Sequence, residues 1–288
     1  MRAAFAVTGG QPPGIGLRCV NRIPHGRGLG SSAAAIVAGI LAARELHPEA
    51  AEAAARLPDA ALLGLATGLE GHPDNAAACL AGGLTIAWTA GSPPLPATAP
   101  HAGISPQAST PPQASTPPHA ATAPHMIRLD PDTSIRPVIC VAPSPVRTKT
   151  ARGLLPAEVP HQDAAVNAGH SALLIAALTS PAANTPERAA LVLAATEDRL
   201  HQEYRAPAMP DTIGLLHRLR AEGIAAVVSG AGPSVLALLT GPGRSDYRHQ
   251  LDRLGSIVQE TGIAWRVSSL DVERQGARVL RPEPSPGN

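Results

Sequence analysis

Residues 23–35 read IPHGRGLGSSAAA, and this stretch is the strongest indication of the fold. Gly26, Gly28 and Gly30 allow the backbone to turn sharply and to approach a ligand closely. Ser31 and Ser32 stand at the expected start of a helix, where free backbone N–H groups and the helix dipole attract phosphate. A serine hydroxyl at this place can also reach magnesium, which prefers oxygen ligands. The residues alone leave open a second interpretation, an ordinary glycine-rich turn with Ser31 as the helix cap.

A second segment, residues 69–88, reads LEGHPDNAAACLAGGLTIAW. It places Glu70, His72, Asp74 and Asn75 in one short loop between two helical stretches. Carboxylates near a phosphate-binding loop suit a magnesium–nucleotide site, and a histidine there can bind a substrate carboxylate or hydroxyl. The alternative is a helix cap formed by Asp or Asn beside a solvated histidine.

Three further segments carry candidate residues. Residues 229–238 read SGAGPSVLAL, two apolar strands about a Gly-Pro turn, which is also the pattern of a tight hairpin without a ligand. Residues 145–156 place Thr148 and Arg152 four positions apart, and residues 198–210 place Arg205 at the end of an amphipathic helix. An arginine can hold a carboxylate by two parallel hydrogen bonds. Each arginine is otherwise a solvated surface charge.

The first segment resembles the second motif of the GHMP kinases, a family of small-molecule kinases. In that motif an apolar residue and a proline precede a short spacer, Gly-Leu-Gly-Ser-Ser and two small residues, and every position matches here. Residues 229–238 resemble the third motif, a glycine-rich loop that packs against the phosphate site. The resemblance implies ATP as the phosphate donor, with Mg²⁺. It implies an ATP-binding set formed by Pro24, Gly26, Arg27, Gly28, Leu29, Gly30, Ser31, Ser32, Ala33, Ala34, Gly230 and Gly232.

The other segments are similar to those of the homoserine kinase branch of this family. This resemblance implies Ser32 and Glu70 as magnesium ligands, and Ser32, Glu70 and Arg152 as the catalytic set. It implies that the substrate is bound by His72, Asn75, Thr148, Arg152 and Arg205. The implied reaction is phosphorylation of the side-chain hydroxyl of L-homoserine in threonine biosynthesis, with no dedicated general base. A mevalonate-type kinase and a nucleotide-binding remnant without catalysis are the alternatives.

The family also implies an α+β fold of two domains. Residues 1–135 would form an ATP-binding, ribosomal-protein-S5-domain-2-like domain, and residues 136–282 a ferredoxin-like α/β sandwich, with the active site between them. Residues 91–124 are rich in Pro, Ala, Ser and Thr, a composition that cannot bury enough apolar surface to fold. We interpret them as a disordered surface insertion, with a polyproline ligand or an interdomain linker as alternatives. Residues 283–288 are expected to be a disordered tail.

The N-terminal domain is expected to be incomplete, because family members carry a first motif ahead of the phosphate loop. Here that loop begins at residue 24, which leaves no room for the first strands or for the substrate-binding Asn and Asp that they supply. A wrongly assigned start codon or a true truncation would explain this. Unpaired strand edges and exposed apolar surface are the expected consequences.

Composition excludes several other classes of protein. The chain has 288 residues with a net charge of +1, which gives no electrostatic footprint for nucleic acid or an anionic membrane. Its only lysine is Lys149, so no lysine-bearing P-loop exists at the glycine-rich stretch. Three scattered cysteines fit a reduced, cytoplasmic compartment, and no apolar run approaches the roughly 18 residues of a membrane helix. Many family members pair as dimers, so the resemblance allows a homodimer.

Hydrophobic periodicity predicts the main elements. Helices are expected over residues 31–46, 60–69, 164–178, 186–204 and 213–221, and strands over residues 15–20, 84–88, 127–129, 138–142, 225–228 and 235–239.

Overall fold

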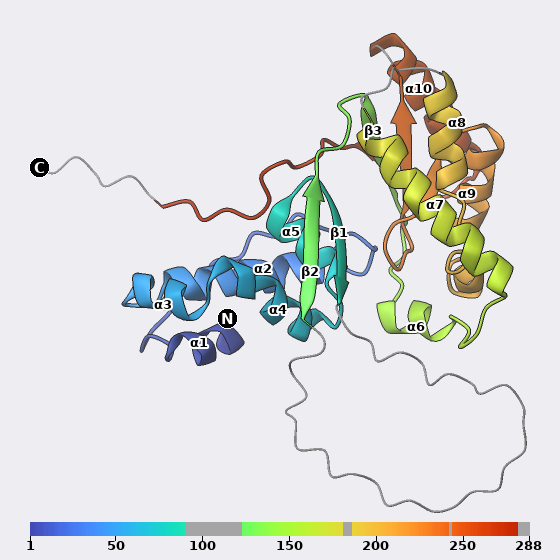
Figure 1. Cartoon of the computed structure of the whole chain (residues 1–288). Coiled ribbons are helices and arrows are strands. Elements are labelled where there is room, and N and C mark those ends of the chain that lie inside the picture. The colour runs from blue at the N-terminus through green and yellow to red at the C-terminus, as the bar shows by residue number, and fades with distance from the viewer. Residues whose placement is uncertain (90–122, 181–185, 242–243, 282–288) are drawn as a thin grey trace, which may run out of the picture.

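The computed structural model describes residues 1–89, 123–180, 186–241 and 244–281 (Figure 1). The proposed insertion at 91–124 lies outside the described residues except for its last two positions, and the expected tail at 283–288 lies wholly outside them.

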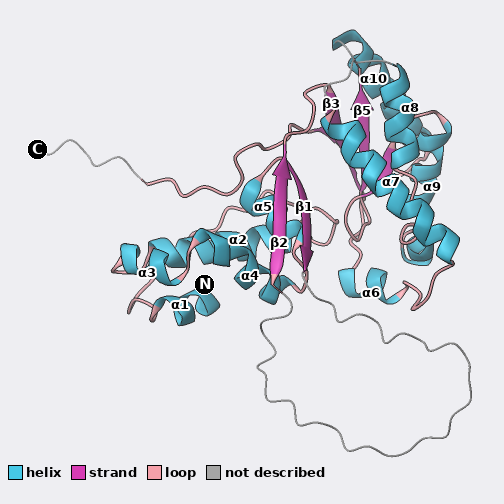
Figure 2. Ribbon diagram, in the orientation of Figure 1, coloured by secondary structure: helices cyan, strands magenta, loops and turns pink. Residues whose placement is uncertain are grey.

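The N-terminal part consists of helices around one central helix, with a two-stranded sheet beside them (Figure 2). Its elements are α1 (Arg2–Thr8), α2 (Ser31–Glu45), α3 (Ala50–Arg56), α4 (Asp59–Glu70), α5 (Asp74–Ala81), β1 (Leu84–Thr89) and β2 (Pro124–Leu129). Helix α2 contacts each of the four other helices. Its buried residues include Ala33, Val37 and Ile40, and small alanines such as Ala66 and Ala76 let the neighbouring helices approach closely. Leucine, isoleucine and valine side chains therefore fill this core between closely packed alanines, and Phe5 adds one ring.

Strands β1 and β2 pair antiparallel from Leu84 opposite Leu129 to Thr89 opposite Pro124. Residues 90–122 therefore connect two neighbouring strands of one sheet. At this end of the hairpin the rings of Trp88 and His125 stack, with centroids 5.5 Å apart.

The C-terminal part has a four-stranded antiparallel sheet in the order β4-β5-β3-β6. Its elements are β3 (Ile135–Val141), α6 (Thr148–Gly153), α7 (His161–Thr179), α8 (Pro186–Ala195), a 3₁₀ helix η1 (Glu203–Ala208), α9 (Pro210–Ala221), β4 (Ala226–Val228), β5 (Val235–Thr240), α10 (Arg244–Glu260) and β6 (Arg266–Ser269). The chain thus runs strand, helices, strand, strand, helix, strand, and the first strand lies at the sheet centre. This order is ferredoxin-like, which confirms the expected fold class.

A second core lies between this sheet and its helices. Alternate residues Val235, Ala237 and Leu239 of β5 are buried, as the two-residue period of a strand requires, and Leu216 and Leu254 of the helices pack in the same cluster. Helices α8, α9 and α10 all contact β5.

Residues 271–281, which we call the strap, return from the last strand to the N-terminal part (Figure 1). The Gly83 N–H donates to the Glu273 carbonyl at 2.6 Å, and Arg281 pairs with Glu45 of α2 at 2.6 Å. Gly276 has φ +72°, and a Cβ there would lie 2.2 Å from the Leu80 carbonyl oxygen, so this crossing requires glycine. The strap therefore ties the C-terminal part to α2 and α5.

Two predicted elements differ from the structure. Residues 15–20 form no strand, because within the described residues β1 pairs only with β2; Leu17 and Val20 are 61% and 72% exposed. The predicted helix over 186–204 ends at Ala195. The Asp198 carboxylate accepts hydrogen bonds from the backbone N–H groups of Leu200, His201 and Gln202, which starts a separate turn.

Candidate functional site

The glycine-rich loop turns through three residues with positive φ: Gly26 (64°), Gly28 (71°) and Gly30 (71°). Gly30 is the residue before α2 and has no side chain with which to cap the helix, so Ser31 is the first helical residue and not the cap. The first backbone N–H groups of α2 therefore have no partner within the helix and are available to an anion.

The loop is fixed by residues far along the chain. Ser229 Oγ donates to the Gly28 carbonyl at 2.8 Å, and a Cβ on Gly28 would lie only 2.0 Å from the Ser229 carbonyl oxygen. Arg27 Nη2 donates at 2.6 Å to the carbonyl of Pro143, which lies two residues beyond the end of β3. The turn at residues 229–232 and the end of β3 thus hold the loop against the C-terminal part. The turn at 229–232 is indeed a hairpin turn, because it joins β4 and β5, which pair antiparallel. It is more than a hairpin turn, because it also packs against the glycine-rich loop.

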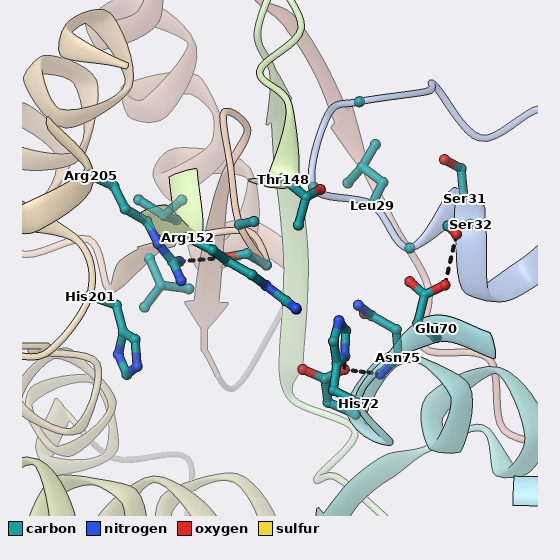
Figure 3. A pocket seen from close by; sticks show the side chains of 18 of the residues that line it. Leu29, Ser31, Ser32, Glu70, His72, Asn75, Thr148, Arg152, His201 and Arg205 are labelled. Atoms are coloured by element: carbon teal, nitrogen blue, oxygen red, sulfur yellow. Dashed lines mark hydrogen bonds and ion pairs between the residues drawn. The ribbon is translucent and has the colours of Figure 1, made fainter. Parts of the chain in front are cut away.

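A cavity of about 440 Å³ opens between the two parts of the chain (Figure 3). Among the predicted ATP-binding residues, those that line it are Gly26, Gly28, Leu29, Gly30, Ser31, Ser32 and Gly230. All predicted substrate-binding residues line it as well, namely His72, Asn75, Thr148, Arg152 and Arg205. Segments more than two hundred residues apart in the sequence therefore meet at one place.

Five residues of the predicted ATP-binding set do not line this cavity: Pro24, Arg27, Ala33, Ala34 and Gly232. Arg27 braces the loop, and Ala33 is fully buried under it. Ala34 borders a neighbouring apolar cavity, and a Cβ on Gly232 would lie 2.5 Å from Met209 Sδ. Arg27, Ala33 and Gly232 thus support the loop and its turn without lining the cavity.

On one side of the cavity the Ser32 hydroxyl and the Glu70 carboxylate bring two oxygen donors together. Ser32 lies in the first turn of α2 and Glu70 is the last residue of α4, and Ser32 Oγ donates to Glu70 Oε2 at 2.7 Å (Figure 3). Among the described residues no group of three or more His, Cys, Asp or Glu could hold a metal alone. A hydroxyl and one carboxylate fit Mg²⁺, which usually keeps several waters and takes its other ligands from phosphate oxygens.

His72, Asp74 and Asn75 form the floor of the cavity at the start of α5. His72 Nδ1 contacts Asp74 Oδ1, which also accepts the Asn75 N–H at 2.6 Å. The helix-cap alternative does not hold, because Asp74 is the first helical residue of α5 after Pro73 and no side chain caps this helix. His72 is only 19% exposed and is not a solvated side chain. Asn75 faces Gly30, whose added Cβ would lie 3.5 Å from Asn75 Oδ1.

The opposite side carries two guanidinium groups, those of Arg152 on α6 and Arg205 on η1 (Figure 3). Arg205 is 9% exposed, and its Nη1 donates to the Gly230 carbonyl at 3.0 Å. Its Nε is buried with no partner among the described residues. Burial lowers the pKa of Arg205; the Asp198 carboxylate opposes this shift and the Arg152 charge adds to it. Two cations close together in a half-enclosed cavity favour an anionic ligand.

The structure adds Asp198, His201 and Gln202 to the lining, which sequence reasoning missed. Asp198 accepts five hydrogen bonds, three from the backbone of residues 200–202, one from Asn167 and one from His201 Nδ1 at 3.0 Å. Gln202 Oε1 accepts the Val228 N–H of β4 at 2.6 Å. The sequence did carry a signal for this turn, since an Asp followed three residues later by His201 is typical of an Asp-capped turn.

Asp198 yields a prediction about stability and pH. Burial acts to raise the pKa of Asp198, but the hydrogen bonds from His201, Gln202, Asn167 and Leu200 outweigh it and hold the pKa well below its usual range. A lowered folded-state pKa contributes stability that is fully present above the unfolded value of about 3.9 and is lost progressively as the pH falls from there through the folded-state pKa. We expect Asp198→Asn to lower the free energy of unfolding by about 1–3 kcal/mol at pH 7.

Urea denaturation at pH 7, 5 and 3 checks this. The difference in the free energy of unfolding between wild type and Asp198→Asn should be the same at pH 7 and 5 and should become smaller at pH 3. Asp252→Asn, at an exposed position of α10, is the matched control and should leave stability unchanged. A difference that stays constant with pH would contradict the expectation.

Comparison with known protein families shows to which family the chain belongs. The profile of the GHMP kinases N terminal domain matches residues 1–83, and the GHMP kinases C terminal profile matches residues 174–264. The chain belongs to the GHMP kinase family. As a GHMP kinase it has the expected two-part α+β fold, with its glycine-rich loop inside the first matched region.

Proteins named homoserine kinase are similar to this GHMP kinase over nearly its whole length. That of Streptomyces coelicolor is 48% identical over 280 residues, which are 97% of this chain and 74% of that protein. That of Clavibacter michiganensis is 44% identical over 276 residues, 96% of this chain and 72% of that protein. The solved homoserine kinase of Cytophaga hutchinsonii has a TM-score of 0.63 at 22% identity, covering 89% of this chain and 69% of that one. At that identity the likeness shows the fold alone.

The expectation that the N-terminal domain is incomplete is wrong. The N-terminal GHMP domain is found at residues 1–83. Residues 2–8, ahead of the loop, form α1, and its Ala4 and Phe5 are buried in the core beside α2. As to membranes, no helix of the described residues is both long and apolar enough to span a bilayer.

Proposed function

We propose that this GHMP kinase is a homoserine kinase, which transfers the γ-phosphoryl group of ATP to the side-chain hydroxyl of L-homoserine in threonine biosynthesis. The observation that carries the proposal is the cavity itself. It brings a hydroxyl, a carboxylate and the glycine-rich loop to one side, and the guanidinium groups of Arg152 and Arg205 to the other. Relatives of that name at 42–48% identity support it. A cytoplasmic location belongs to the same proposal; the domain boundary near residue 135 and a homodimer stay predictions.

Residues in different parts of the cavity bind different parts of the two substrates. The N–H groups at the start of α2 and the glycine-rich loop bind the phosphates of ATP. Ser32 and Glu70 hold Mg²⁺, which when bound neutralises charge on the phosphate oxygens. Arg152 and Arg205 bind the substrate carboxylate, and Thr148, His72 and Asn75 orient its hydroxyl toward the loop. Phosphoryl transfer has a loose transition state, so placement and electrostatics carry the rate without a dedicated base.

A mevalonate-type kinase is the second candidate, because mevalonate also carries a carboxylate and a hydroxyl. A coupled ADP-release assay with L-homoserine and with mevalonate separates the two. We expect turnover with L-homoserine at 1 s⁻¹ or more, within the roughly 1–10³ s⁻¹ of ordinary enzymes, and none above background with mevalonate. The reverse preference would refute the proposed substrate, and ATP binding without transfer to either would indicate a non-catalytic protein.

Arg205 provides a second test of this assignment. Arg205→Met keeps much of the side-chain volume and removes the guanidinium. We expect it to raise KM for L-homoserine about 10–100-fold, because a hydrogen bond to a charged group is lost. KM for ATP should stay within about twofold of wild type. Arg253→Met removes a surface partner of Glu222 outside the cavity and should change neither constant. A rise in KM for ATP alone would place Arg205 in the nucleotide site instead.

A further inference from the structure

Residues 143–146, which we call the linker, lie between β3 and α6 and form neither helix nor strand. Helix α6 begins at Thr148, so the linker leads almost directly into the two residues that α6 contributes to the cavity, Thr148 and Arg152 (Figure 3). The placement of the linker therefore helps to determine where these two side chains lie.

The linker is hydrogen-bonded to the glycine-rich loop. Arg27 Nη2 donates to the Pro143 carbonyl at 2.6 Å, and the Val146 N–H donates to the Gly26 carbonyl at 3.1 Å. Within the described ranges these are the only hydrogen bonds that the linker makes to segments other than β3 and α6. The two backbones are also closely packed, since a Cβ on Gly26 would lie 3.1 Å from Pro145 Cβ. Loop and linker thus form one junction.

Arg27 lies in this junction and does not line the cavity, although it belongs to the loop that binds phosphate. Its Nη1 is buried and has no hydrogen-bond partner in the part of the chain that the structure describes. A buried donor without a partner costs free energy. The side chain therefore contributes mainly through Nη2 and its hydrogen bond to the linker.

This junction offers a path between the two halves of the site. A loop with three glycines has much conformational freedom, which bound phosphates would remove. Once the loop is ordered, its hydrogen bonds also hold the linker and the start of α6. A second ligand that binds to α6 then pays less conformational entropy, so the two ligands favour each other's binding.

We propose that Arg27 is a positioning residue that couples the two substrates: through the linker it makes a nucleotide on the glycine-rich loop raise the affinity for L-homoserine at Thr148 and Arg152. The proposal rests on the proposed function. It gives Arg27 a different role from that of a phosphate ligand. Because coupling in binding is reciprocal, L-homoserine raises the affinity for the nucleotide by the same factor.

The test measures this coupling directly at equilibrium. Isothermal titration calorimetry on the full chain gives Kd for L-homoserine, first without nucleotide and then with saturating Mg²⁺ and AMP-PNP, an ATP analogue that is not hydrolysed. The ratio of the two values is the coupling factor. In wild type we expect it to be about fivefold or more, and the reverse titration should give the same factor for AMP-PNP.

Arg27→Met keeps much of the length of the side chain and removes the donor to the linker. We expect the coupling factor to fall to within about twofold of one, while each ligand alone binds within about threefold of wild type. Arg27→Lys keeps a cation and an N–H donor and should retain part of the factor. If Arg27→Met does not fold, Arg27→Lys decides, and its factor must then lie below that of wild type.

Arg56→Met is the matched control, because Arg56 Nη1 also donates to a distant backbone carbonyl, that of Thr8 at 2.9 Å, but outside the cavity. Its coupling factor should equal that of wild type. A wild-type factor near one, or an undiminished factor in Arg27→Met, would overturn the proposal. An unchanged factor with AMP-PNP alone bound tenfold more weakly would make Arg27 a phosphate ligand instead. Absence of any wild-type turnover with ATP and L-homoserine would refute the proposed function itself.

Discussion

Replacement of Glu70 by Gln is expected to lower kcat by about two to three orders of magnitude. The change removes the carboxylate charge but keeps an oxygen that can accept the Ser32 hydroxyl, whose distance from Glu70 Oε2 is 2.7 Å. Ser32→Ala, which removes the other oxygen, should have an effect of similar size. Because the proposed ligands are this hydroxyl and this carboxylate, each contributes a large share of the protein's hold on Mg²⁺.

The measurement is turnover as a function of Mg²⁺ concentration, together with thermal unfolding. Both variants should need more Mg²⁺ for half-maximal rate and should unfold within about 2 °C of wild type, because the Ser32–Glu70 contact is exposed. Glu52→Gln on α3 is the control, since its carboxylate forms only a surface pair with Arg56. Full activity in both Ser32→Ala and Glu70→Gln would show that the metal assignment is wrong.

Gly28→Ala is expected to have the second large effect, on both stability and ATP binding. A side chain at φ +71° costs about 1–2 kcal/mol by itself. The new Cβ would also lie 2.0 Å from the Ser229 carbonyl oxygen, so the loop and the turn at 229–232 must separate. That separation breaks the Ser229 hydrogen bond to Gly28 and widens the cavity where phosphate binds. We expect a total loss of at least about 3 kcal/mol and ATP affinity lowered tenfold or more.

Gly64→Ala provides the matched control for this substitution. Gly64 lies within α4, and a Cβ there meets nothing within 4 Å. The alanine should stabilise the helix by up to about 1 kcal/mol and leave ATP affinity unchanged. Differential scanning calorimetry and nucleotide titration on the two variants make the comparison. A Gly28→Ala protein that behaves like Gly64→Ala would show that the loop is not constrained by the turn.

Features that depend on neighbours in the chain were predictable from the sequence. The glycine spacing at Gly26, Gly28 and Gly30 indicated a sharp turn before a helix, and the structure has positive φ at all three with α2 following. The predicted strands at 84–88 and 235–239 correspond to β1 and β5, and the predicted helix at 213–221 lies within α9. Each follows from local periodicity and backbone preference.

Features that depend on partners far along the chain were not predictable in the same way. Residues 15–20 have the composition of a strand, yet among the described residues no neighbouring strand pairs with them. The early end of the helix expected over 186–204 has a local cause instead, since the Asp198 carboxylate competes for the backbone N–H groups of residues 200–202. Helices α1 and α10 were not predicted, although Phe5 and Leu254 pack in the two cores.

The sequence by itself determined the family, the identity of the phosphate loop and the residue types available for chemistry, because these follow from local spacing and from motifs that can be read in order. Only the tertiary structure decided which of them share a cavity. It placed Ser32 beside Glu70 and Arg205 beside the Gly230 carbonyl, and it added Asp198 and His201 to the wall. The physical reason is that such contacts join residues tens to hundreds of positions apart, and their distances are set by the packing of two cores and the strap, which no local pattern encodes.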